Sequence, residues 1–311
     1  MDIRQLGVNI RDFSLEDGDL GSQGYTRVLL QLFGYTGHGK SSFVNSCKYV
    51  LEKGESLEEH AEARETDHGL TMVRNAYPLT DVITVVDNRG CSSMNGFQRA
   101  EVYAQLGNFF PIGQSVEWKN NYSDMMEAIE SSELDPNFSD FIVPIFVYSA
   151  RQEISAKEIQ DDVQTFMENC VKMTGIVPII VLTFKTKGDY LEVEKRFRLM
   201  GAETVIAIEN YTPESHIKTL GRTTDILMVI DSALRNVRFR LEQPRNPKRE
   251  RIERKKFMYN YIHQIQLHQE REKLEREKHE GVKFERNIVA YPIYGGNLRS
   301  FARDEDKCRL S

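Results

Sequence analysis

Apolar stretches of strand length alternate with longer amphipathic stretches from about residue 26 to residue 243. The predicted strands are Arg27–Phe33, Met72–Leu79, Val82–Val86, Ile142–Tyr148, Val177–Phe184 and Thr204–Ile208. The predicted helices between and after them are Lys40–Leu51, Phe97–Phe109, Ala156–Met173, Tyr190–Leu199 and Asp225–Leu241. This alternation is typical of an α/β fold of three layers, in which helices cover both faces of a mostly parallel sheet.

One pair of strands departs from the parallel pattern. Only Thr80 and Asp81 link the second predicted strand to the third, which is the length of a hairpin turn. We therefore expect one antiparallel edge strand. Residues 111–140 are polar and form an insertion without an assigned role, whereas residues 1–23 show no clear period and are either a packed arm or a frayed one.

Basic residues gather after the last strand–helix unit. The cluster comprises Arg245, Lys248, Arg249, Arg251, Arg254, Lys255 and Lys256. Met258, Tyr261, Ile262 and Ile265 follow at helical spacing, which predicts a charged helix with a short apolar stripe. Two interpretations remain open: the stripe packs on the main domain, or the basic cluster 245–256 contacts a membrane surface or a partner. The predicted organisation is an arm (1–23), a nucleotide-binding domain (24–243) and a charged helical extension with a tail (244–311).

Composition narrows the class of protein. The formal net charge of -6 argues against non-specific nucleic-acid binding by the whole chain, and the four cysteines show no metal-ligand spacing. The start of the chain has no apolar segment of a signal peptide, and the longest uncharged apolar run, 175–184, is too short to span a membrane. These features predict a cytoplasmic protein that is peripheral to membranes at most.

The strongest motif follows the first strand. Gly34, Gly37, Gly39, Lys40 and Ser41 complete the pattern G-x-x-x-x-G-K-[ST] at the entrance to a helix. Glycines let the backbone curl so that several amides and the helix N-terminus converge on phosphate oxygens. Lys40 is expected to reach the β- and γ-phosphates, and the Ser41 hydroxyl is expected to bind Mg²⁺.

Two further residues of this segment belong to the predicted site with less defined roles. His38 is expected to contact phosphate, or to replace a catalytic group that the chain lacks. Ser42 is either a second ligand or, more in keeping with its place in the helix, a packing residue.

A second element, Asp87-Asn88-Arg89-Gly90, follows the third strand. A carboxylate at this edge of the sheet is placed to hold a metal-bound water, and the Gly90 amide is placed to donate to a γ-phosphate. A threonine from the preceding loop should complete the Mg²⁺ site. Thr71, immediately before the second strand, is preferred, and Thr66 is the alternative.

The third element predicts the base. Thr186-Lys187-Gly188-Asp189 follows the fifth strand in the form [NT]-K-x-D. The Asp189 carboxylate would accept hydrogen bonds from guanine N1–H and the N2 amine, which adenine cannot present together. Lys187 would lie along the base. Asn210, after the sixth strand, either closes over the base or caps its turn.

These segments together resemble the interferon-induced protein 44 family, within the wider Ras-like GTPases. The resemblance rests on LFGYTGHGKSSFVNS, VVDNRG, TKGD, ENYTPES and DILMVIDSALRNV, which span about residues 24–243. It implies a P-loop GTPase fold and a cytoplasmic protein that binds GTP or GDP with Mg²⁺ and acts as a slow GTPase switch in immune-type responses. The alternatives are a nucleotide-binding interaction module that does not hydrolyse GTP and, less favoured, an ATPase.

Two departures from the Ras-type pattern affect catalysis. Cys91 stands where those hydrolases carry a glutamine that orients water, and Thr36 stands where they carry a glycine. Hydrolysis would then be slow or would need a group from a second copy or a partner protein, unless His38 or Arg89 substitutes. The terminal Cys308-Arg309-Leu310-Ser311 has the shape of a farnesylation signal, although Arg309 and the preceding segment RDEDK, which is not polybasic, disfavour it.

Overall fold

The computed structural model describes residues 2–52, 56–61, 73–92, 96–115, 122–132, 139–154 and 157–289. The chain divides into two compact units, 1–263 and 264–311. The first unit contains the sheet and every described helix except α8 (Pro247–Val289), whose residues belong to both units.

A six-stranded sheet in the order β2-β3-β1-β4-β5-β6 forms the centre of the first unit. Its strands are β1 (Arg27–Phe33), β2 (Asn75–Pro78), β3 (Ile83–Asp87), β4 (Asp140–Ser149), β5 (Ile179–Thr183) and β6 (Val205–Ala207). Only β2 runs antiparallel to its neighbour, with Ala76 opposite Val86, and the other four pairs are parallel. The predicted three-layer α/β fold with one antiparallel edge strand is therefore confirmed.

Most strand boundaries fall within a few residues of the prediction. β1 has the predicted bounds, and β2 is shorter than predicted, although Met72 lies outside the described residues. β4 begins two residues earlier, at Asp140, whose carboxylate pairs with Arg27 on β1 at 2.9 Å. β5 ends at Thr183 rather than Phe184. This last difference matters for the site, because it moves the end of the strand away from Thr186.

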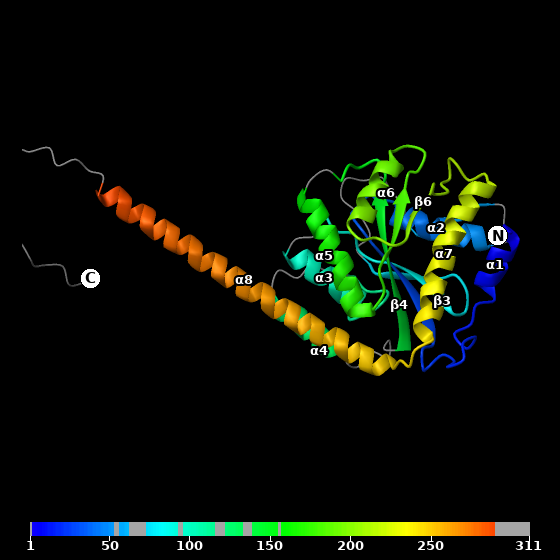
Figure 1. Ribbon diagram of the computed structural model, residues 1–311, viewed down its shortest axis with the longest axis horizontal. Coiled ribbons are helices and arrows are strands. Elements are labelled where there is room, and N and C mark those ends of the chain that lie inside the picture. Colours follow the sequence, from blue (N-terminus) through cyan, green and yellow to red (C-terminus); the bar gives the residue numbers. More distant parts are fainter. Residues whose placement is uncertain are drawn as a thin grey trace, which may run out of the picture. The chain divides into compact units, whose positions relative to one another are not determined.

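Helices cover both faces of the sheet (Figure 1). One face packs against α1 (Ile3–Arg11), α2 (Lys40–Leu51) and α7 (Leu220–Leu241), and the other against α3 (Gly96–Leu106), α5 (Lys157–Thr174) and α6 (Tyr190–Leu199). β1 is buried on both faces, as expected for a central parallel strand. Its alternate residues Val28, Leu30 and Leu32 belong to the core shared with α2 and α7.

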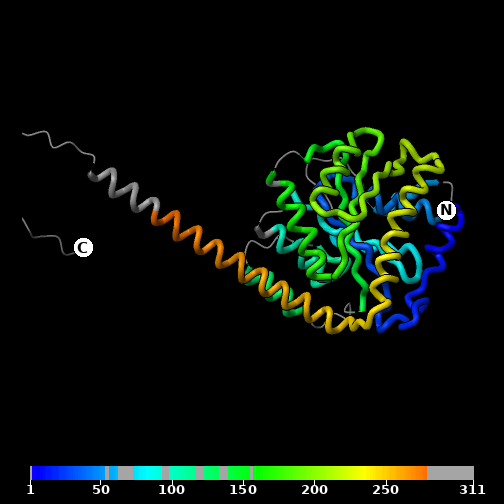
Figure 2. Tube along the Cα trace, viewed as in Figure 1, coloured from blue at the N-terminus to red at the C-terminus, as the bar shows by residue number. Residues whose placement is uncertain are grey.

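The N-terminal arm is packed rather than frayed. α1 begins after Asp2, whose carboxylate accepts the Arg4 amide at 3.1 Å, and it buries Leu6 and Ile10. Figure 2 shows this blue segment beside the yellow α7, with which it shares the core. α7 itself begins five residues earlier than predicted, because Thr219 caps it through the Arg222 amide at 3.4 Å.

The predicted insertion contains a helix of its own. α4 (Tyr122–Ser131) buries Tyr122, Met125 and Ile129, which lie at helical spacing on one side of it. The sequence analysis did not predict this helix, because its apolar stripe consists of only these three residues in a polar segment.

Part of the basic cluster after α7 is a packing surface. Arg251, Arg254 and Lys255 are only 7%, 3% and 8% exposed. Arg251 donates to the carbonyl oxygens of Asn108 and Ser132 at 3.2 and 2.7 Å. The predicted apolar stripe follows them along α8, where Met258 and Ile262 are buried and the ring of Tyr261 packs against that of Tyr103.

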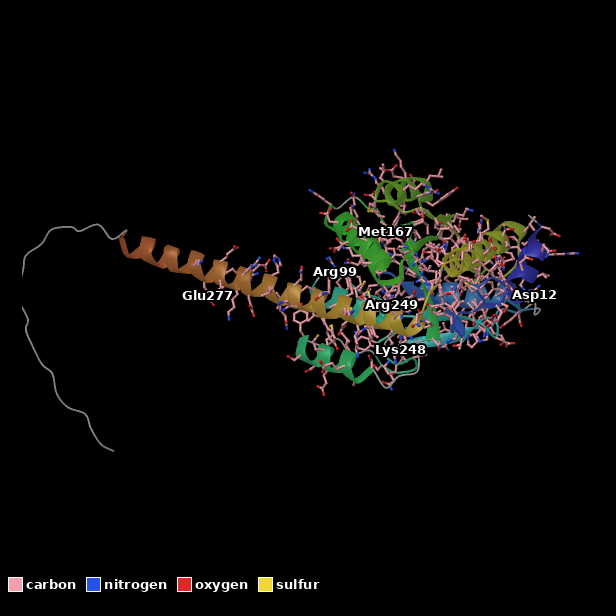
Figure 3. The ribbon with its side chains drawn as sticks, turned by 60° about the horizontal axis from the view of Figure 1, so that its bottom comes forward. Asp12, Arg99, Met167, Lys248, Arg249 and Glu277 are labelled. Atoms are coloured by element: carbon pink, nitrogen blue, oxygen red, sulfur yellow. The ribbon has the colours of Figure 1, made fainter. Side chains whose placement is uncertain are left out.

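Three of the seven basic residues are therefore not available to contact a membrane surface or a partner. Lys248 and Arg249, on the first turn of α8 in Figure 3, are exposed, as is Lys256. Met258, Tyr261 and Ile262 of the stripe pack on the main domain, as the first of the two interpretations expected.

The second unit contains the rest of α8, from residue 264 to Val289. Its described side chains are mostly charged, and Glu272 pairs with His268 and Arg276 one turn away on either side. None of the helices in the described ranges has both the length and the apolar character that crossing a membrane requires.

Candidate functional site

The loop after β1, residues 34–41, has the curled backbone that its phosphate-binding motif predicts, and it is called the phosphate-binding loop below. Gly34, Gly37 and Gly39 have φ of +137°, +75° and +85°, a region that side chains rarely adopt. A Cβ at Gly34 would lie 2.1 Å from the Val147 carbonyl oxygen, so only glycine fits there. The curled backbone then enters α2 at Lys40.

Lys40 lies inside this loop. It is 6% exposed, and its Nζ donates to the carbonyl oxygens of Gly34 at 3.1 Å and Tyr35 at 2.9 Å. Burial lowers the pKa of Lys40, and the negative charge of Asp87 opposes this shift. The loop therefore holds a desolvated ammonium group at its centre, which is the group that a polyphosphate would compensate.

Asp87, at the end of β3, faces the start of α2. Its Oδ2 accepts the Ser41 hydroxyl at 2.6 Å, and the residue is 1% exposed. Among the described residues its buried Oδ1 has no hydrogen-bond partner. Burial raises the pKa of Asp87, while Lys40 and Ser41 lower it.

This pair of oxygens fits Mg²⁺. A carboxylate with a free buried oxygen beside a serine hydroxyl supplies the hard oxygen ligands that Mg²⁺ prefers, and phosphates and water normally complete its octahedron. No group of three or more His, Cys, Asp or Glu side chains with metal-ligand geometry occurs in the described segments.

Gly90 lies over Lys40. A Cβ at Gly90 would come within 2.7 Å of Lys40 Nζ and 3.1 Å of the Thr36 hydroxyl. The loop after β3 thus closes on the phosphate-binding loop, where the prediction placed it. Cys91 continues this contact, because its carbonyl oxygen accepts the Thr36 amide at 3.0 Å.

The Cys91 thiol is buried, and burial raises its pKa to about 11. A protonated, inaccessible thiol cannot orient or activate water. The structure therefore gives the position after Gly90 a packing role.

His38 joins the phosphate-binding loop to β4. Its Nδ1 accepts the Ser149 amide at 3.2 Å, and its ring packs edge-on to Tyr148 at 4.8 Å. Burial lowers the pKa of His38 to about 3, and the positive charges of Lys40 and Arg151 add to the effect. The imidazole is neutral and its Nδ1 is occupied, which favours a role in bracing the loop over one as a catalytic base.

A threonine outside the sequence motifs also contacts the phosphate-binding loop. The fully buried Thr183, the last residue of β5, donates its hydroxyl to the His38 carbonyl oxygen at 2.8 Å. The next residue, Phe184, has φ of +58°, so the chain turns sharply out of the strand. A signal was present in the sequence, because Thr183 ends the apolar run IIVLT.

The predicted base-recognition element lies beyond this turn. Thr186 donates its amide and its hydroxyl to Glu209 Oε2, at 2.8 and 2.7 Å. Lys187 is exposed. Asp189 is also exposed and caps α6 by accepting the Glu192 amide at 3.2 Å. The structure therefore brings Thr186 to the loop after β6 and leaves Asp189 exposed at the N-terminus of α6.

Asn210 braces the phosphate-binding loop from the other side. Its Nδ2 donates to the Gly39 carbonyl oxygen at 3.1 Å, and its Oδ1 accepts the Ser46 hydroxyl at 3.3 Å. Arg222 fixes the Asn210 backbone by donating to its carbonyl oxygen at 2.5 Å. These contacts hold the Asn210 side chain against the phosphate-binding loop and α2.

A buried polar network supports the loop after β3. Arg74 is fully buried and donates to Asn88 Oδ1 at 2.8 Å and to Gln31 Oε1 at 3.2 Å. The signal for it was Gln31, a polar residue within the apolar strand VLLQLF.

The remaining predicted residues are less informative. Ser42 lies in α2, where its carbonyl oxygen accepts the Ser46 hydroxyl, as a helix-packing residue would. Thr66, Thr71 and Cys308 fall outside the described residues.

Comparison with known proteins gives distant likenesses only. No protein-family model matches the sequence, and no curated protein matches it. Toc33 from Arabidopsis thaliana in complex with GDP and Mg²⁺ is similar with a TM-score of 0.42 and 15% identity, over 78% of this chain and 93% of that chain. One chain of an oligomerised bacterial dynamin pair is similar with a TM-score of 0.32 and 13% identity, over 92% of this chain and 49% of that one.

Proposed function

We propose that this protein binds guanine nucleotides with Mg²⁺ and is at most a slow GTPase. The observation that carries the proposal is the buried Lys40 ammonium, held by the Gly34 and Tyr35 carbonyl oxygens next to Gly90. A buried cation enclosed by a glycine-rich loop at a helix N-terminus is suited to a polyphosphate. The resemblance to the interferon-induced protein 44 family supports guanine as the base and an immune-type, cytoplasmic role.

The residues divide the work of binding. Loop amides and Lys40 would neutralise the β- and γ-phosphates, and the Gly90 amide would donate to the γ-phosphate. Mg²⁺, held by Ser41 and Asp87, would add its positive charge to the same phosphate oxygens. His38, Thr183 and Asn210 would hold the loop in its binding shape, so that little reorganisation accompanies binding.

Hydrolysis requires an oriented water, and two observations support a slow rate. The Cys91 thiol is buried, and the neutral His38 ring already accepts a hydrogen bond at Nδ1. A second copy or a partner protein would then supply the missing group, which in related chemistry raises kcat by about 10³ to 10⁵. A binding module that does not turn over GTP is the second candidate, and the same two observations favour it. Single-turnover phosphate release with excess protein separates the two.

Calorimetry with GTP, GDP and ATP in Mg²⁺ buffer tests the binding proposal. Lys40→Ala should weaken GDP binding by at least about 100-fold, because several charge-assisted hydrogen bonds are lost. Lys195→Ala is the matched control, since Lys195 is 71% exposed on α6. Equal affinity of the wild type for ATP and GTP would contradict the choice of guanine, and unchanged binding by Lys40→Ala would contradict the site.

A further inference from the structure

A group of polar and charged side chains lies at the end of the sheet opposite to the phosphate-binding loop. Tyr25 precedes β1 and the phosphate-binding loop follows it, so the seven residues of that strand, about 23 Å, separate the two places. Figure 1 shows the end of α7 and the start of α8 beside the first residues of β4, at this end of the sheet. The side chains that interact electrostatically there are Tyr25, Arg240, Arg245, Glu250 and Arg254.

The group contains three guanidinium ions and one carboxylate. Glu250 forms ion pairs with Arg245 and, at 3.7 Å, with Arg254. Arg240 has no carboxylate within ion-pairing distance among the described residues, although it lies close enough to Arg245 for their charges to repel. The three arginines therefore exceed the one carboxylate by two positive charges.

Each of these arginines also keeps an unused hydrogen-bond donor. The Nε atoms of Arg240, Arg245 and Arg254 are buried, and none has a hydrogen-bond partner in the part of the chain that the structure describes. The side chains of Arg245 and Arg254 are only 10% and 3% exposed. Buried donors are normally paired, because an unpaired one has lost its water without gaining an acceptor. The group thus lacks acceptors as well as negative charge.

The pKa values of the arginines agree with this deficit. Burial lowers the pKa of Arg254 to about 10, and the positive charges of Arg251 and Arg245 add to the effect, while Glu250 opposes it. Burial and the charge of Arg245 also lower the pKa of Arg240. Because arginine keeps its proton in proteins, these shifts indicate a demand for an anion.

Packing holds two of the arginines in place without hydrogen bonds. A Cβ at Gly175 would lie 2.1 Å from Arg240 Nη2, so this guanidinium rests directly on the Gly175 backbone. The Arg245 guanidinium lies over the ring of Phe141, 5.8 Å from its centroid. The positive charges are therefore fixed before any ligand binds.

A phosphate group supplies what the group lacks. It carries close to two negative charges at neutral pH, which equals the excess of the arginines over Glu250. Its oxygens accept the paired N–H donors of a guanidinium fork, and a carboxylate would bring only one charge. Arg240 and Glu250 are partly exposed, so a small anion can reach the group from solvent.

We infer that Arg240, Arg245 and Arg254 form a second anion site, which takes a small phosphate-bearing ligand. Arg240 and Arg245 would contact the phosphate, and Arg254, buried beside Glu250, would add its charge. A bound phosphate would join the end of α7 to the start of α8 and to the start of β1. The inference is independent of the proposed nucleotide function.

Calorimetry on the full chain tests this site in the Lys40→Ala variant, so that Lys40 does not contribute to phosphate binding. The probes are inorganic phosphate, glycerol phosphate and acetate, at ionic strength matched with chloride. Arg240→Gln in this background should weaken phosphate binding about 10- to 100-fold, because hydrogen bonds between charged groups are lost. Arg235→Gln is the matched control, since Arg235 is 61% exposed on the same helix and pairs with Asp231.

The two phosphate probes distinguish the source of the ligand, because the one that binds more tightly shows whether the site takes a free phosphate or a phosphate ester. No saturable binding of either probe, equal binding of acetate, or unchanged binding by Arg240→Gln would overturn the inference. GDP binding by the wild type is unaffected by any of these results. Thermal unfolding checks that each variant is folded, and if Arg240→Gln is not, Arg245→Gln replaces it with the same expected loss.

Discussion

The phosphate end and the base end of the candidate site are built differently. At the phosphate end, the predicted phosphate and Mg²⁺ contacts come from the eight-residue loop 34–41 and from Asp87, and the side chains of Lys40 and Asp87 are buried. At the base end, loops after β5 and β6 and the first turns of α7 meet through hydrogen bonds of Thr186, Glu209 and Arg222. The Thr186 side chain is exposed.

The difference separates affinity from specificity. Buried, preorganised charges at the phosphate end are coupled to the packing of the sheet, so changes there should alter stability as well as binding. Loop contacts at the base end can change without disturbing the core, so changes there should alter the choice of base. Each of the following variants tests one side of this contrast.

The largest effect is expected at Gly34. Gly34→Ala would place a Cβ 2.1 Å from the Val147 carbonyl oxygen at a φ of +137°, and we expect a loss of about 3 kcal/mol or more in unfolding free energy. Gly37→Ala is the matched control, because nothing lies within 4 Å of its Cβ and only backbone strain of about 1 kcal/mol remains. Chemical unfolding measures both. Equal losses would show that the loop is not packed against β4 as described.

Asp87→Asn should raise the stability of the ligand-free protein and weaken its Mg²⁺-dependent nucleotide binding. Burial raises the pKa of Asp87, so the ligand-free protein loses stability as pH rises through that raised value, and a neutral amide avoids the loss. Mg²⁺ should then improve GDP binding at least 10-fold less than in the wild type. Unfolding at pH 5 and 8, together with titrations with and without Mg²⁺, measures both effects. A variant with unchanged Mg²⁺ dependence would exclude Asp87 as the metal ligand.

His38→Gln should change the acid limb of the stability curve. His38 has a pKa of about 3 when folded and about 6.5 when unfolded. Between these values the unfolded chain binds a proton at His38 and the folded chain does not. The unfolding free energy therefore falls by up to about 1.4 kcal/mol for each unit by which the pH is lowered. Unfolding free energies measured from pH 7 to 4 should fall less steeply in the variant. Parallel curves would mean that His38 is not held neutral.

Asn210→Ala should have the smallest effect of these variants. It removes the brace on the Gly39 carbonyl oxygen, a neutral hydrogen bond, and should weaken GDP binding about 3- to 10-fold without changing the preference for guanine. Nucleotide titration measures it, with Asn260→Ala on the exposed side of α8 as the control. A change of base preference would instead place Asn210 at the base end.

The contrast between the phosphate end and the base end also explains which parts of the fold and the site could be predicted from the sequence. The curl of the loop after β1 was predictable, because its geometry is local and glycine positions report it directly. The mostly parallel sheet followed from strand–helix alternation, and its antiparallel edge strand followed from the short link between the second and third predicted strands. Each of these signals lies within a short stretch of chain.

The base end was not predictable in the same way. The turn at Phe184 ends β5 at Thr183, and beyond it Thr186 contacts Glu209, a residue distant in sequence. A four-letter motif such as Thr186–Asp189 carries no information about that contact. The buried role of Arg251 was hidden for a similar reason, because its partners are backbone carbonyl oxygens at Asn108 and Ser132.

Amide hydrogen exchange in the presence and absence of GDP and Mg²⁺ tests the central claim most directly. Peptides covering residues 34–41 and 87–91 should gain protection when nucleotide binds, and Lys40→Ala should abolish the gain. Protection that appears elsewhere, or nowhere, at saturating GDP would contradict a phosphate site built around Lys40.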